Sequence, residues 1–100
     1  MLIGLVEAFT RLNFWREAKT SLEVHVSLVG VWADIWGTVR EVKGTIVEIG
    51  SDAGTLRLEL REAFFDWRDD FPSPSHFTTC LLAEFRNGDK FLFSSLREVK

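Results

Sequence analysis

The chain reads FTTCLLAEF over residues 77–85, RNGDK over residues 86–90 and FLF over residues 91–93. An Asn-Gly pair between two apolar runs is the strongest short-range signal for a β-hairpin, because both residues accept the positive φ angles of a tight turn. The sequence therefore predicts strands over about 77–86 and 90–94, joined at Asn87-Gly88. Apolar residues of both parities in these strands predict that both of their faces are covered.

Three more strand segments are predicted upstream of this hairpin. Residues 22–29 alternate apolar and polar side chains, as a strand with one buried face does. Residues 38–49 have apolar positions of different parity on the two sides of Gly44, which predicts one strand that bends at this glycine. A turn at residues 51–54 and a clean alternation over residues 55–60 then complete a second hairpin.

The remaining segments predict one helix and two connections. Residues 2–19 place Leu5, Ala8, Phe9, Leu12 and Trp15 at helical spacing, so they predict an amphipathic helix that docks on the sheet. Residues 31–37 are interpreted as a connection. Residues 61–75 are interpreted as one long loop, because prolines at 72 and 74 stop both helix and central strand.

One helix followed by about five strands in 100 residues predicts a mainly β fold in a single domain over residues 1–100. The expected architecture is a strongly bent five-stranded antiparallel sheet that closes into a small barrel of the SH3-like or Sm-like kind. Such barrels serve as binding scaffolds more often than as enzymes. We therefore expect a nonenzymatic domain that acts through protein–protein contacts.

Composition limits the classes of partner. A net charge of -3 provides no broad positive field for a phosphate backbone, so nucleic-acid binding is disfavoured. The lone Cys80 excludes an intramolecular disulfide and lies among apolar residues typical of a strand. No apolar run approaches the length needed to span a bilayer. We expect a soluble cytoplasmic protein with no membrane association, no metal and no cofactor.

Aromatic side chains are more numerous than a small core needs, with nine Phe and four Trp. Several lie in or beside the predicted loops, where burial within one chain is harder, and aromatic anchors are enriched at protein interfaces. Core packing, a protein or self interface, and base or ligand stacking all remain open for them. The interface interpretation predicts that the chain forms a homo-oligomer or binds another protein. The candidate interface residues are Trp32, Trp36, Phe64, Phe65, Trp67 and Phe71.

Two short motifs carry a family resemblance. GTIVEI at residues 44–49 looks like the bent, glycine-containing second strand of the Sm-like family, and FRNGD at residues 85–89 looks like its arginine-glycine turn. The resemblance implies ring-type assembly and, as the alternative function, RNA binding. In that alternative Arg86 and Asn87 contact the nucleotide, and the phosphate contacts come from Lys43, Arg57 and Arg61.

A third hypothesis is a metal site or a hydrolase built on residues 62–76, here named the acidic segment. Asp66, Asp69 and Asp70, with Glu62 before them and His76 after them, supply ligand atoms that divalent metals accept. Their spacing matches no established metal loop, so the segment is interpreted as a solvated loop.

Overall fold

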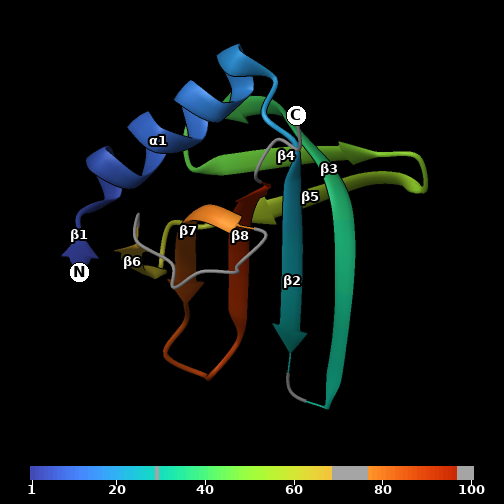
Figure 1. Ribbon diagram of the computed structural model, residues 1–100. Coiled ribbons are helices and arrows are strands. Elements are labelled where there is room, and N and C mark those ends of the chain that lie inside the picture. The colour runs from blue at the N-terminus through green and yellow to red at the C-terminus, as the bar shows by residue number, and fades with distance from the viewer. Residues whose placement is uncertain (29, 69–76, 97–100) are drawn as a thin grey trace.

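The computed structural model describes residues 1–28, 30–68 and 77–96 (Figure 1). In chain order the elements are β1 (Leu2–Ile3), α1 (Leu5–Ala18), β2 (Leu22–Leu28), β3 (Val31–Lys43), β4 (Ile46–Ser51), β5 (Gly54–Glu59), β6 (Phe64–Arg68), β7 (Phe77–Glu84) and β8 (Lys90–Leu96). The predicted hairpins at Asn87-Gly88 and at residues 51–54 are both confirmed.

The strands form one antiparallel sheet in the order β1-β6-β7-β8-β2-β3-β4-β5. A mainly β fold with an N-terminal helix is thus confirmed. The predicted five-stranded barrel is not confirmed, because the described sheet has eight strands and is open, with β1 and β5 at its two ends. Two of the extra strands come from the predicted long loop, which contains β6, and from the predicted helix, whose first residues form β1.

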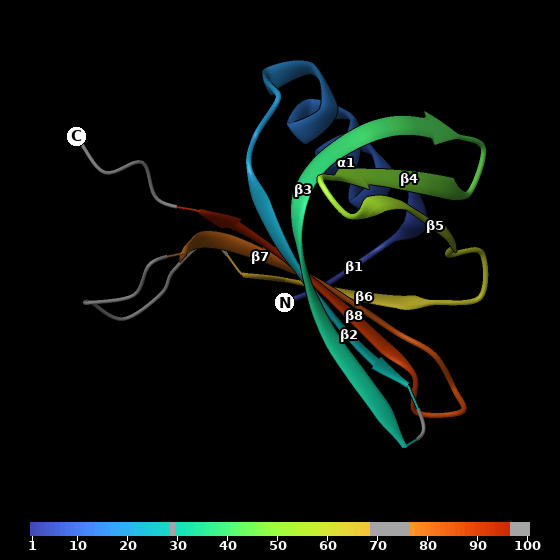
Figure 2. The same ribbon diagram turned by 90° about the vertical axis from the view of Figure 1, so that its right-hand side faces the viewer.

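The long strand β3 gives the sheet its curvature. Its first half pairs with β2, and its second half, from Thr38 to Lys43, pairs with β4. The register shifts between Val39 and Glu41, as expected where one residue bulges out of a ladder. Figure 2 shows β3 arching from the β2–β3 hairpin toward β4 and β5. The segment 31–37, predicted as a connection, is therefore strand.

Gly44 was predicted to bend a strand, but the structure places it in a turn and puts a close backbone approach at Gly37 instead. Gly44 does not bend a strand but occupies the turn between β3 and β4, with a φ of 60°. The close approach lies instead at Gly37, where an added Cβ would stand 2.1 Å from the carbonyl oxygen of Gly50. A side chain at position 37 would therefore push β4 away from the corner of the sheet.

Helix α1 covers one face of the curved sheet and packs against β3 and β6. It begins at Leu5 rather than at residue 2, because Leu2 and Ile3 pair with Asp66 and Phe65 of β6. Its buried stripe, Ala8, Phe9, Leu12 and Trp15, is the predicted one apart from Leu5, which stays exposed.

The core lies between α1 and the sheet. The ring of Phe9 meets that of Phe65 edge-on at 6.2 Å, and Trp15 packs on Trp67 at 5.5 Å. Phe93 and Leu81 are completely buried beside them. The helix therefore covers only one side of β6, β7, β8 and β2, and no described element covers the other side.

Candidate protein interface

The uncovered side of the sheet, here named the open face, is defined by the strand registers. Paired residues on antiparallel strands point to the same side, so the register identifies rows of neighbouring side chains. The three rows are Phe64–Glu84–Lys90–Ser27–Trp32, Leu2–Asp66–Leu82–Leu92–His25–Asp34 and Arg68–Cys80–Ser94–Glu23–Trp36. Leu82 and Leu92 lie at its centre and are half-buried, whereas Cys80 and Ser94 of the third row are buried. Burial on both faces of the β7–β8 hairpin is therefore seen at one end of the open face only.

Residues 31–37 of β3, here named the free edge, pair with only one neighbour among the described strands. β2 pairs along all of them, whereas β4 pairs with β3 only from Thr38 onward. In Figure 1 this lower half of β3 runs along the margin of the sheet with no strand outside it. An unpaired edge presents backbone donors and acceptors that can pair with another chain.

The direction of these backbone groups follows from the hairpin that begins β3. Only residues 29 and 30 separate the paired residues Leu28 and Val31, and so tight a loop is closed by a hydrogen-bonded pair. Hydrogen-bonded and non-hydrogen-bonded pairs alternate along an antiparallel ladder, so Ala33 and Ile35 also bond toward β2. The N–H and C=O groups of Trp32, Asp34 and Trp36 therefore point outward from the free edge.

The free edge carries little protection against association. Trp32 and Trp36 are 70% and 57% exposed, and both project onto the open face. Lysine and proline, which natural edge strands use to discourage pairing, do not occur in residues 31–37. Asp34 is the one ionisable residue of this segment.

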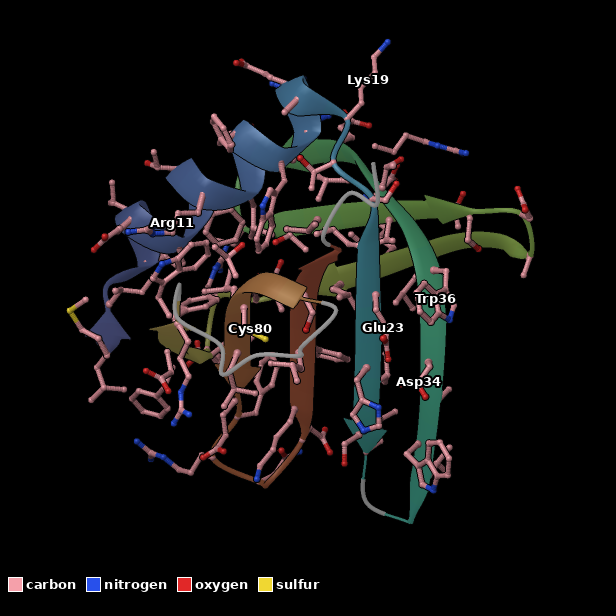
Figure 3. All side chains as sticks on the ribbon, viewed as in Figure 1. Arg11, Lys19, Glu23, Asp34, Trp36 and Cys80 are labelled. Atoms are coloured by element: carbon pink, nitrogen blue, oxygen red, sulfur yellow. The ribbon has the colours of Figure 1, made fainter. Side chains whose placement is uncertain are left out.

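Asp34 is held by residues of the neighbouring strand β2 (Figure 3). Its carboxylate lies 2.5 Å from Nδ1 of His25, whose ring stacks on Trp32 with centroids 5.9 Å apart. Partial burial raises the pKa of Glu23, and the nearby Asp34 carboxylate raises it further. Glu23, His25 and Asp34 thus form a polar cluster beside the two exposed tryptophans.

The six predicted interface aromatics divide between the open face and the core. Phe64 lies on the open face with Trp32 and Trp36 and is 59% exposed, but β7, β8 and β2 separate it from them. Phe65 and Trp67 point to the other side of β6 and are 3% and 6% exposed, so they belong to the core. Phe71 lies outside the described residues.

The predicted RNA-binding residues are spread over several elements. Arg86 and Asn87 form the exposed turn between β7 and β8, where the Asn87 side chain bonds to Asp89. Lys43 ends β3, and Arg61 follows β5 close by, since Leu60 N–H bonds to the carbonyl of Thr45. Arg57 lies on β5, where its Nε is 4.0 Å from Glu48.

These basic residues are interspersed with acids. Glu48 lies 4.0 Å from Arg57, while Arg86 and Asn87 share a hollow of about 330 Å³ with Glu62 and Phe64. An acidic residue therefore lies close to three of the five predicted RNA contacts.

A larger hollow of about 440 Å³ lies between α1 and β6 and is lined mainly by apolar atoms of Phe14, Trp15 and Trp67. The Arg11 guanidinium stacks over the Trp67 ring at 3.9 Å. The Nε1 of Trp67 and the Nε of Arg11 are buried without a hydrogen-bond partner in the described structure. Glu7, Thr10, Arg11 and Thr79 also line this hollow, so polar groups lie beside its apolar wall.

The side chains considered for metal binding and catalysis do not come together in the described structure. Its residues contain no cluster of three or more His, Cys, Asp or Glu side chains that could hold a metal ion. His25 contacts Asp34 and Trp32, whereas the Cys80 thiol contacts Ser94 and has a pKa raised by burial. Asp69, Asp70 and His76 of the acidic segment lie outside the described residues.

Comparisons with known proteins identified no relative: no family model, curated protein or solved structure matches this chain. The described helix is too short and too polar to cross a membrane. The sequence patterns predicted Trp32 and Trp36 as interface residues but did not reveal the unpaired backbone beside them. The signal was present in VWADIWG, where β-branched and aromatic residues occupy both parities.

Proposed function

We propose that this chain is a nonenzymatic binding protein that acts through protein–protein contacts at the free edge of β3 and the adjoining open face. The observation that carries the proposal is the coincidence of unpaired backbone groups with two exposed tryptophans on residues 31–37. Self-association is one form of this activity, and strand pairing with another protein is the other.

Strand addition to a sheet edge is an established mode of recognition. Main-chain hydrogen bonds supply affinity, and side chains that alternate along the added strand supply specificity. Trp32 and Trp36 are large and mostly exposed, so a partner that covers them removes apolar area from water on the same side as the new hydrogen bonds. Backbone pairing and aromatic burial thus favour the same surface.

Photocrosslinking tests this function even when the partner is unidentified. A benzoylphenylalanine placed at Trp36 lies on the free edge, and the same group at Glu17 lies on the exposed side of α1, away from the strand edges, as the control. We expect discrete protein adducts in cells from position 36 and none from position 17. Equal labelling from both positions, or adducts to nucleic acid alone, would contradict protein binding at the free edge.

A further inference from the structure

We propose that the partner of the free edge is a second copy of this chain, paired antiparallel about a twofold axis that passes between the two Asp34 residues. Residues 31–37 of one protomer then run beside residues 37–31 of the other, and the two sheets become one continuous sheet. This proposal rests on the proposed function, and it adds the identity of the partner and the geometry of the pairing.

The outward hydrogen-bonding groups select this register. They belong to Trp32, Asp34 and Trp36, and an antiparallel partner satisfies them only where two outward-directed residues meet. With the axis at Asp34, this residue meets its own copy and each Trp32 meets a Trp36 of the second copy. Every outward N–H and C=O of residues 31–37 is then paired.

The two neighbouring registers would leave some of these outward N–H and C=O groups without a partner. With the axis at Ile35, Trp32 would face Thr38 of the second copy, but the outer side of Thr38 is already paired with Gly50 of β4. With the axis at Ala33, Trp36 would face Gly30, which lies in a turn with a φ of 81° and does not continue the strand. The axis at Asp34 avoids both conflicts.

The side chains support this register at the centre of the pairing and on the open face. On the side that α1 covers, Ala33 faces Ile35 of the second copy, so a smaller residue meets a larger one. Val31 faces Gly37, where Gly50 and Ser51 of β4 already fill the space beside the glycine, so Val31 must pack against β4 there. On the open face, Trp32 faces Trp36 of the second copy at both ends of the pairing. Aromatic cross-strand pairs add stability beyond the area they bury.

The two Asp34 carboxylates meet at the axis, where like charges disfavour pairing. Each of them is bonded to His25 of its own chain, and Glu23 lies beside it. The interface is therefore self-complementary in its backbone, with one charged position that contacts a histidine within each chain.

The area of the interface indicates that the dimer is weak. An aromatic side chain buries on the order of 150 to 250 Å², and the four tryptophans keep one side exposed on the open face, so their pairing removes less than roughly 500 Å² from water. Val31, Ile35 and the paired backbone add to this area, but the total stays near the lower limit of specific interfaces, about 1,200 Å². We expect a monomer–dimer equilibrium with a dissociation constant on the order of micromolar.

Disulfide trapping tests the register directly. Hydrogen-bonded antiparallel pairs have Cα atoms about 5.5 Å apart, within the range that a disulfide bridges. The Asp34→Cys variant should therefore form a disulfide-linked dimer under mild oxidation. The Trp32→Cys variant should stay monomeric alone, because its two copies lie about 13 Å apart along the strands, but should crosslink when mixed with Trp36→Cys.

The wild-type chain, whose Cys80 is buried, is oxidised in parallel as the background control. Crosslinking of Asp34→Cys and of the Trp32→Cys and Trp36→Cys mixture, with Trp32→Cys alone monomeric, supports the proposal. A wild-type dimer in light scattering without these crosslinks overturns the register and leaves protein binding intact. Adducts from position 36 to other proteins, with a monomeric chain, overturn the second copy as partner. No adduct from position 36 contradicts the proposed function itself.

Discussion

Proline substitution at two adjacent positions of β3 tests the assigned direction of its backbone groups. Ala33 and Asp34 both have exposed side chains in extended backbone, so neither change empties the core. The Ala33 N–H bonds toward β2, whereas the Asp34 N–H points outward from the free edge. Proline removes the N–H in each case, but only at position 33 does it break a bond within the sheet.

The expected effects on the free energy of unfolding differ accordingly. At Ala33 the change removes a hydrogen bond of about 1 kcal/mol and leaves the carbonyl of buried Val26 unpaired, which costs about 1 to 3 kcal/mol more. A loss of about 2 to 4 kcal/mol is large beside a typical stability of about 5 to 15 kcal/mol. At Asp34 the loss should stay below about 1 kcal/mol, because edge strands tolerate proline.

Urea unfolding, followed by tryptophan fluorescence and circular dichroism, measures this difference at a protein concentration low enough for the monomer. The Asp34→Ala variant serves as the control for the lost contact with His25. Equal destabilisation by the two prolines, or a greater effect at Asp34, would show that the alternation along β3 has the opposite phase. The outward groups would then belong to Ala33 and Ile35, and the proposed register would fail with them.

Three further outcomes follow from the structure. Gly37→Ala should destabilise the fold by at least about 2 kcal/mol in urea unfolding, because the added Cβ would lie 2.1 Å from the Gly50 carbonyl oxygen. The control Gly4→Ala places its Cβ more than 4 Å from any other atom and should have little effect. Glu23→Gln should raise the melting temperature at neutral pH and not at acidic pH. The pKa of Glu23 is raised in the folded chain, so ionisation of this carboxyl costs stability as the pH rises through that pKa, and glutamine removes this cost. An equal gain at both pH values would refute this assignment. Short uridine-rich RNA titrated at low salt should not bind, given the net charge of -3, and binding abolished by Arg86→Ala would instead support the RNA alternative.

Local signals were enough to predict the helix and the hairpins. Ala8, Leu12 and Trp15 recur at helical spacing, and the Asn87-Gly88 turn lies between two apolar runs. Both signals depend only on neighbouring residues, so the rest of the fold does not affect them. The alternation over residues 22–28 likewise reflects one face packed on the core.

The missed strands depend on distant partners. β1 is only two residues long and exists because Leu2 and Ile3 pair with β6, far along the chain. The free edge has exposed side chains on both faces, so it lacks the alternation that marks a half-buried strand. Its backbone direction is fixed by the pairing of Leu28 with Val31, which residues 31–37 alone do not reveal.

Only part of the candidate interface was predicted, again because pairing with distant strands decides which aromatic residues are exposed. Aromatic residues near predicted loops included Trp32 and Trp36, which are exposed, but also Phe65 and Trp67, which are buried. Once residues 64–68 are recognised as strand β6, strict alternation sends Phe64 to the open face and Phe65 and Trp67 to the core. Recognising this strand required its pairing with β7, a segment outside the local sequence.

The most direct test of self-association through the free edge is the solution mass of the wild-type chain and of Asp34→Pro, measured by light scattering over a wide concentration range. We expect a monomer that converts to a dimer as the wild-type concentration rises. Loss of two hydrogen bonds at the axis, about 1 kcal/mol each, should weaken Asp34→Pro association about 30-fold or more. A wild-type chain that stays monomeric throughout, or an Asp34→Pro chain that dimerises equally well, would contradict self-association through this edge.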